Sequence, residues 1–136
     1  MAIGMQTVKF ADYWPERPLR CLSNIKVLKQ LDAIAESGGL VGLNFGVYDL
    51  REDWDDNPDT SIETMIRHID HLVAHLGIDG VVLGTDFDGT RVPNEIGDAA
   101  GLPKLIDALR MHGYDDNALR KIGYENWLRV LSQTWK

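Results

Sequence analysis

Two short apolar runs dominate the pattern of hydrophobic and polar positions, LVGLNF at residues 40–45 and VVL at residues 81–83. Each run is continuous rather than alternating and is bounded by glycine, which is typical of a strand buried on both faces of a parallel sheet. Between the runs, apolar residues up to Leu76 recur every three or four positions and predict an amphipathic helix. Strand, helix and strand then form a βαβ unit, whose crossover should be right-handed.

Helical periodicity predicts further helices on both sides of this unit. The first covers residues 24–36, with Asn24 as its N-cap and Gly38 just after its end. The crossover helix begins at a capping box, in which the side chains of Thr60 and Glu63 bond each other's backbone N–H groups. Three more helices are expected after the second strand, at residues 101–112, 115–122 and 124–135.

The two strands are too few for a complete sheet. Three or more strands are normally needed, and each strand here leaves an edge that could pair with another chain. Because no strand pattern follows Thr90, we expect a two-stranded parallel fragment of a larger sheet, with helices on one side of it. The last helix should turn three side chains inward: Trp127, Leu128 and Leu131.

Composition narrows the class of protein. The chain has 136 residues, enough for one domain at most, and its net charge of −7 argues against nucleic-acid or anionic-membrane partners. No apolar run approaches the roughly 18 residues that span a bilayer, and the first residues lack the basic-then-apolar order of a secretory signal. The single Cys21 excludes an internal disulfide and fits a reducing compartment. We therefore expect a soluble, cytoplasmic protein.

Two groups of polar side chains could hold a metal, but neither has a recognised ligand pattern. Residues 46–59 carry six carboxylates, yet the ligand order and central glycine of an EF-hand are missing, which favours a solvated loop. His68, His71 and His75 lie within about 60° of one another on the crossover helix. No nearby carboxylate or cysteine completes a metal-ligand set, so we expect them to flank the contact between helix and sheet.

The strongest candidate for chemistry is the segment after the second strand. Asp86 and Asp88 follow the strand directly, where α/β proteins build their sites, although aspartates there can also simply cap turns. The run Asp86 to Thr90, DFDGT, resembles the signature of haloacid-dehalogenase-type phosphatases, in which the first Asp attacks phosphorus and the second is the acid/base, with Mg²⁺. That fold needs more strands downstream, where the pattern here is helical.

A longer resemblance covers about four-fifths of the chain, from Leu28 to Trp135. Blocks in four places are similar, in the same order, to the C-terminal part of the membrane (renal-type) dipeptidases, peptidase family M19. These blocks are QLDAIAESGGLVGLNF at 30–45, HIDH at 68–71, GIDGVVLGTDFDG at 77–89 and ENWLRV at 125–130.

The resemblance implies the C-terminal portion of a (β/α)₈ TIM barrel, with residues 40–45 as the seventh strand and 81–86 as the eighth. In such barrels the active site lies at the carboxyl ends of the strands, and four residues should be less covered here than in a whole barrel: Val81, Leu83, Leu43 and Phe45. Family members bind two Zn²⁺ ions, bridged by a glutamate and a water, and hydrolyse dipeptides; some accept β-lactam-like substrates. Asp86 matches the family's acid beside that water, which implies a role as general acid/base.

The metal ligands of the family all precede the matched region. They are a His-x-Asp, a glutamate and two further histidines, whereas residues 1–27 contain no histidine, and Arg17 and Arg20 are no secure match for the family's substrate-binding arginine. We therefore expect an irregular segment at 1–22, a partial barrel at 23–136, no metal ligand in this chain and no activity of the chain alone. The alternative is a non-catalytic, degenerate homologue whose strands pair with another chain, with a second copy or with the missing part of the barrel.

Overall fold

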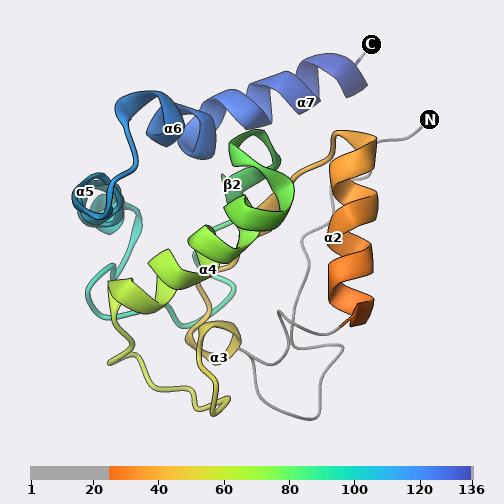
Figure 1. Ribbon diagram of the computed structural model, residues 1–136. Helices are drawn as coiled ribbons and strands as arrows, with labels where there is room; N and C mark the ends of the chain where they lie inside the picture. The colour runs from red at the N-terminus through yellow and green to blue at the C-terminus, as the bar shows by residue number, and fades with distance from the viewer. Residues whose placement is uncertain (1–24, 136) are drawn as a thin grey trace.

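The structure is a computed structural model that describes residues 25–135 (Figure 1). The predictions for the segment 1–22, for Asn24 as a cap and for Arg17 and Arg20 lie outside these residues. The described elements are α2 (Ile25–Ser37), β1 (Val41–Leu43), α3 (Val47–Leu50), α4 (Ile62–Leu76), the 3₁₀ turn η2 (Ile78–Gly80), β2 (Val81–Leu83), the 3₁₀ turn η3 (Ala99–Gly101), α5 (Leu102–His112), α6 (Asp116–Arg120), the π turn η4 (Lys121–Glu125) and α7 (Asn126–Thr134).

The βαβ unit is confirmed. β1 and β2 pair in parallel, with Val41 opposite Val81 and Leu43 opposite Leu83, and α4 connects them. Both strands are three residues long, so β1 is shorter than the six-residue apolar run. Between residues 91 and 135 the structure contains helices and turns without a strand, as the pattern predicts.

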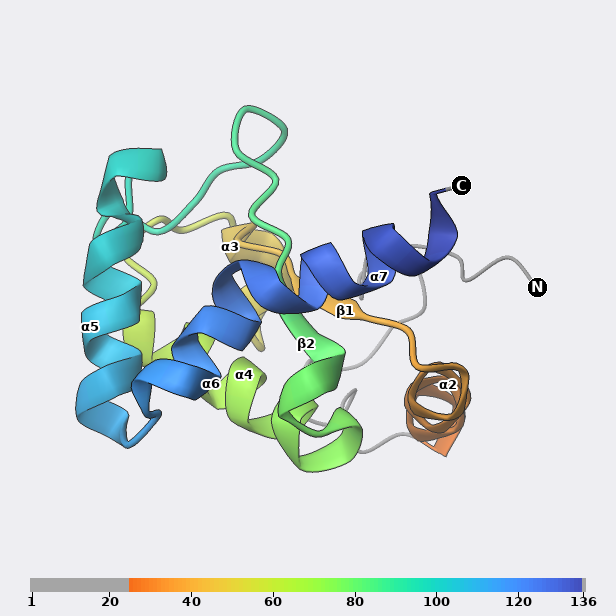
Figure 2. The same ribbon diagram turned by 90° about the horizontal axis from the view of Figure 1, so that it is seen from above.

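One face of the two strands packs against α2 and α4. Val41 and Val81 contact Leu31 of α2 and Leu72 of α4, and all four side chains are buried. Leu43 joins the larger core that α4 forms with α5, α6 and η4. The apolar stripe predicted for α4 therefore lies where expected, between the strands and the outer helices (Figure 2).

The other face is also covered, contrary to the expectation of helices on one side. Figure 2 shows α7 crossing the strands on the side opposite α4, and Val130 packs there against Val82 and Leu40. On the side of α4, Val81 and Phe45 are 0% exposed. The prediction of poorly covered strands is wrong for Val81, Leu43 and Phe45, because residues of α2, α4 and α5 pack against them, whereas Leu83 is partly exposed.

The edge of β2 that faces away from β1 is occupied by side chains. Gly84 donates its N–H to the carbonyl of Leu43, so by the alternation of a strand the carbonyls of Val81 and Leu83 point away from β1. Asn126 Nδ2 donates to the Val81 carbonyl at 2.9 Å, and Trp127 Nε1 donates to the Leu83 carbonyl at 3.2 Å. Two carbonyls at this edge are therefore already hydrogen-bonded.

The prediction for the last helix is confirmed at Trp127, which packs against Leu40, Val82 and Val130, and is wrong at Leu128. Leu128 is 60% exposed, and the buried residues of α7 are Asn126 and Val130. The π turn η4 precedes α7 and has more residues per turn than an α-helix, which shifts the phase of the positions that follow it. A pattern of uniform period could not place these side chains.

Three helix ends have the residues expected to start or end a helix, and one predicted cap is wrong. Asp115 accepts from the N–H of Ala118 at the start of α6, and Gly38 and Gly113 end α2 and α5 with positive φ. The capping box of Thr60 is wrong, because α4 begins one residue later and Thr60 donates its hydroxyl to the carbonyl of Asn57. None of the helices in the described part of the chain has the length and apolar character to cross a membrane.

Candidate functional site at the carboxyl ends of the strands

Asn44 and Asp86 meet where the two strands end. Asn44 follows β1, Asp86 follows β2, and Asn44 Nδ2 donates to Asp86 Oδ2 at 3.1 Å. Asn44 is 4% exposed, whereas Asp86 is exposed to solvent. The parallel pairing of the strands brings both residues to the same edge of the sheet, so a buried amide supports an accessible carboxylate.

The backbone around Asp86 adopts an unusual conformation. Asp86 has φ +56° and Asp88 has φ +68°, in the left-handed region that costs free energy for residues other than glycine. The N–H of Gly89 donates to the Asp86 carbonyl at 3.1 Å. A Cβ placed on Gly89 would lie 2.3 Å from Asp86 Oδ1, so the carboxylate occupies space that only glycine leaves free.

The loops after the two strands are bound to each other. The N–H of Val47 donates to the carbonyl of Arg91 at 2.9 Å, and the rings of Phe45 and Phe87 meet edge to face at 5.8 Å. Phe45 is fully buried. These contacts fix the loop that carries Asp86 relative to the end of β1.

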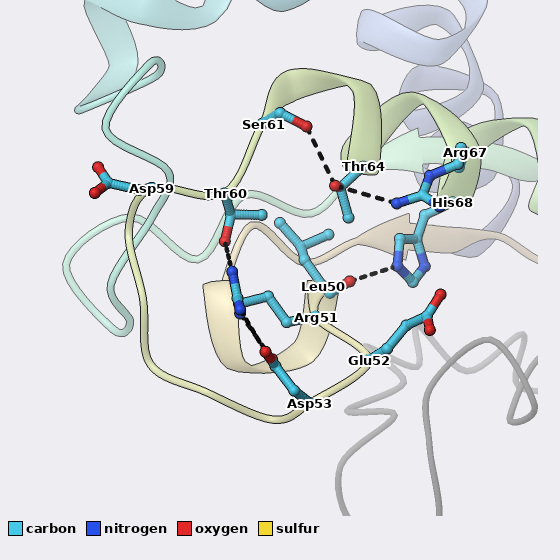
Figure 3. A pocket seen from close by; sticks show the side chains of 10 residues that line it. All are labelled: Leu50, Arg51, Glu52, Asp53, Asp59, Thr60, Ser61, Thr64, Arg67 and His68. Atoms are coloured by element: carbon cyan, nitrogen blue, oxygen red, sulfur yellow. Dashed lines mark hydrogen bonds and ion pairs between the residues drawn. The ribbon is translucent and has the colours of Figure 1, made fainter.

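Two depressions lie near this edge. The one in Figure 3, of about 490 Å³, is lined by residues from α3, the acidic loop and the first turns of α4. Several of its polar side chains are already bound within the protein, including Arg51 to Asp53 and His68 to the Leu50 carbonyl. The second, of about 580 Å³, lies between the loop 87–92 and the segment 94–99, and Phe87 and Asp88 are among its lining residues.

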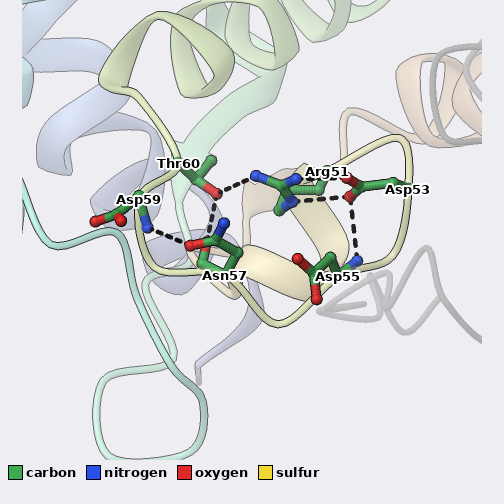
Figure 4. Close-up of polar contacts among 6 residues, drawn as sticks. All are labelled: Arg51, Asp53, Asp55, Asn57, Asp59 and Thr60. Carbon is green, nitrogen blue, oxygen red and sulfur yellow. Dashed lines mark hydrogen bonds and ion pairs between the residues drawn. The ribbon is translucent and has the colours of Figure 1, made fainter.

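The acidic loop forms a set of local polar contacts. Asp53 pairs with Arg51, and this hydrogen bond lowers the pKa of the Asp53 carboxyl (Figure 4). Asn57 accepts from the N–H of Asp59 at 3.0 Å, while Asp59 accepts from Asn94 at 2.8 Å. Figure 4 places Asp53 and Asp59 at opposite ends of the loop, which is the arrangement of a solvated loop with local turns. The first part of the predicted loop is helical, forming α3.

The histidines of α4 have separate roles. Buried His68 donates from Nε2 to the Leu50 carbonyl at 3.0 Å, and its burial lowers the pKa of the imidazole below the ordinary 6.5. His75 bonds the carbonyl of His71 at 2.9 Å, and their rings lie 4.3 Å apart. Within residues 25–135, no group of three His, Cys, Asp or Glu side chains is arranged to hold a metal ion.

A third polar cluster links α4 to α5. His112 Nε2 lies 2.8 Å from Asp70 Oδ2, and the Tyr114 hydroxyl donates to Asp70 Oδ1 at 2.7 Å. Burial and the bond to Asp70 raise the pKa of Tyr114. This cluster fixes two helices of the core and is remote in sequence from the strand ends.

Sequence reasoning selected Asp86 for the strand edge and missed Asn44. The available signal was that Asn44 is the only polar residue in the run 40–45 and occupies its carboxyl end. A polar side chain at that point of a buried strand needs a partner, and the neighbouring parallel strand ends in Asp86.

Comparisons with known proteins agree on one family. Residues 24–136 match the family model described as membrane dipeptidase (peptidase family M19). An uncharacterised protein of Klebsiella pneumoniae, from the pqqA 5′ region, is 52% identical over 108 residues. That alignment covers 79% of this chain and 40% of the Klebsiella protein.

Solved structures match the same portion. A metallopeptidase from Rhodobacter sphaeroides, liganded with a phosphinate mimic of the dipeptide L-Ala-D-Ala, is 47% identical with a TM-score of 0.78. Dipeptidase AC, a metallopeptidase of family M19, is 46% identical with a TM-score of 0.77. Each alignment covers 79% of this chain but about a third (31% and 32%) of the solved chain. The fold is therefore a mixed α/β part of the larger metallopeptidase fold.

Proposed function

We propose that this chain, which belongs to the membrane dipeptidase family (peptidase family M19), contributes the seventh and eighth strands of a (β/α)₈ barrel and the acid/base of a dipeptide-hydrolysing site. The observation that carries the proposal is the exposed carboxylate of Asp86 at the carboxyl end of β2, held by buried Asn44. Catalytic groups in such barrels lie at the same ends of the strands.

The chemistry assigned to Asp86 is a pair of proton transfers. As a water oxygen forms a bond to the peptide carbonyl carbon, Asp86 accepts the proton released from that water. As the C–N bond then breaks, Asp86 returns the proton to the leaving amine, so that the carboxylate is regenerated and two amino acids are released. The exposure of Asp86 allows a substrate to reach it.

The metal ions in this proposal are inferred from the family alone. When bound, two zinc ions would polarise the peptide carbonyl and acidify the attacking water. The described residues include no set of ligands that fits an ion, so we assign no zinc ligand to them. The steps above use Asp86 alone, and we expect the chain by itself, supplied with Zn²⁺, to show no dipeptide turnover.

A chimera tests the assignment of Asp86. The matching segment of the Rhodobacter sphaeroides metallopeptidase is replaced by residues 24–136 of this chain, and hydrolysis of L-Ala-D-Ala is measured. Asp86→Asn, which keeps the shape and tolerates positive φ, should lower kcat by about 10²- to 10⁴-fold. Asp88→Asn is the matched control, since Asp88 is also exposed with positive φ, and it should leave turnover intact. Loss with Asp88→Asn but not with Asp86→Asn would overturn the assignment.

Of the two other functions suggested by the sequence, the phosphatase gains no support, and strand pairing is disfavoured at the outer edge of β2. A phosphatase of the DFDGT type needs strands after Thr90, and residues 91–135 form helices and turns. A module that acts by strand pairing needs open edges, and two carbonyls on the outer edge of β2 are bound by Asn126 and Trp127.

A further inference from the structure

We infer that Asn44 is a positioning residue that fixes which oxygen of Asp86 exchanges the proton, an inference that rests on the proposed function of Asp86. Three contacts carry it. They are the acceptor bond that orients the Asn44 amide, the donor bond from that amide to Asp86, and the close approach of Asp86 to Gly89.

The orientation of the Asn44 amide is set by the backbone. Its Oδ1 accepts the N–H of Gly46 at 2.7 Å, a contact that only the oxygen end of the amide can make. Nδ2 must then point the other way, where it donates to Asp86 Oδ2 at 3.1 Å. Because Asn44 is 4% exposed, water cannot readily replace either partner.

The donor bond divides the two oxygens of Asp86 into separate roles. Oδ2 is held by Asn44, while no hydrogen bond within the described residues reaches Oδ1, which lies against the Cα side of Gly89. A proton is accepted more readily by an oxygen whose lone pairs are free than by one already bound to an amide. The geometry therefore assigns the proton transfers to Oδ1 and the anchoring of the side chain to Oδ2.

The test is solution NMR on the full 136-residue chain. In the unmodified chain, the two Hα–Hβ couplings of Asp86 should have the values of a single χ1 rotamer and not their average over rotamers. Asn44→Ala should average them, and so should Asn44→Leu, which has a similar size but no N–H to donate. Asn94→Ala is the matched control, because it removes an exposed Asn–Asp bond of 2.8 Å and should leave the Asp86 couplings unchanged. Couplings of a single rotamer that persist in both Asn44 variants would overturn the inference.

Two further readouts keep the result decisive. If the Asn44 variants fail to fold, Asp86→Gly, which removes the carboxylate and tolerates the positive φ, should instead shift the side-chain amide signals of Asn44, and unchanged signals would overturn the inference. In the chimera, Asn44→Ala should lower kcat about 10- to 100-fold at nearly constant KM. The couplings decide the positioning role even where the chimera has no turnover, whereas that lack of turnover counts against the proposed function alone.

Discussion

Gly89 offers a way to move the Asp86 carboxylate without disturbing the backbone. Its φ is not in the left-handed region, so alanine fits the local conformation, but the new Cβ would lie 2.3 Å from Asp86 Oδ1. The exposed carboxylate can swing away from this Cβ, but it then leaves the Asn44 amide. Moving the carboxylate takes the acceptor away from the buried Asn44 amide, so Gly89→Ala should lower the free energy of unfolding by about 1–3 kcal/mol, while kcat in the chimera falls at least about 10-fold.

Gly113→Ala is the control variant, which should lose stability without losing activity. Gly113 ends α5 with φ +121° and has no atom within 4 Å of an added Cβ, so alanine there strains the backbone far from the strand ends. That variant should lose stability in urea titrations and keep its kcat. Equal kcat values for the two variants would show that the space beside Gly89 does not hold the working carboxylate.

The residue scale also shows how far the sequence could predict this site. Asp86 could be selected because it ends a buried apolar run within one segment of the chain. Its hydrogen bond to Asn44 joins residues 42 positions apart, and its positive φ depends on the loop that closes at Gly89. Both features arise from tertiary contacts, which local patterns do not encode.

Helix α4 likewise combines features that the local sequence predicts with a feature that depends on a tertiary contact. Its length and its buried stripe, including Leu72 at 1% exposure, follow from apolar residues at helical spacing. Its N-terminal cap does not, because the hydroxyl of Ser61 makes no cap bond and the N–H of Ile62 is bound by Glu95 Oε1 at 3.1 Å. The carboxylate of Glu95, which lies in a loop 33 residues further along the chain, therefore caps the helix in place of Thr60.

Because Glu95 caps α4, a substitution of Glu95 should lower stability more than a substitution of Ser61 at the N-cap position. Glu95→Ala removes the acceptor for the Ile62 N–H and a negative charge at the helix N-terminus, and should lower the free energy of unfolding by about 0.5–2 kcal/mol. Ser61→Ala, at the formal N-cap, should change it by less than about 0.5 kcal/mol. Urea unfolding followed by circular dichroism measures both. A larger loss for Ser61→Ala would show that the local hydroxyl caps α4 in solution.

At the scale of the whole molecule, α7 joins parts of the chain that local patterns leave unconnected. Arg129 donates to the Gly38 carbonyl at 3.0 Å and to the Asp79 carbonyl at 2.9 Å, in the segments that lead into β1 and β2. These contacts lie at the amino ends of the strands, opposite Asp86. In barrel proteins, residues at the amino ends of the strands usually serve stability, and residues at the carboxyl ends usually serve the chemistry.

The covered edge of β2 leads to the last prediction. Asn126 is 2% exposed and donates to the carbonyls of Ile78 and Val81, so Asn126→Ala leaves buried acceptors without a donor. We expect a loss of about 1–3 kcal/mol in the free energy of unfolding. Adding Trp127→Phe frees the Leu83 carbonyl as well, and an edge with free carbonyls can pair with a second copy.

Sedimentation velocity over a range of concentrations measures that pairing. The double variant Asn126→Ala with Trp127→Phe should associate more strongly than the unmodified chain. Asn117→Ala, which removes an exposed contact to Arg120, should not differ from the unmodified chain. Because the two bound carbonyls are what distinguishes this edge from an open one, equal association of the double variant and the unmodified chain would mean that other contacts keep β2 from pairing.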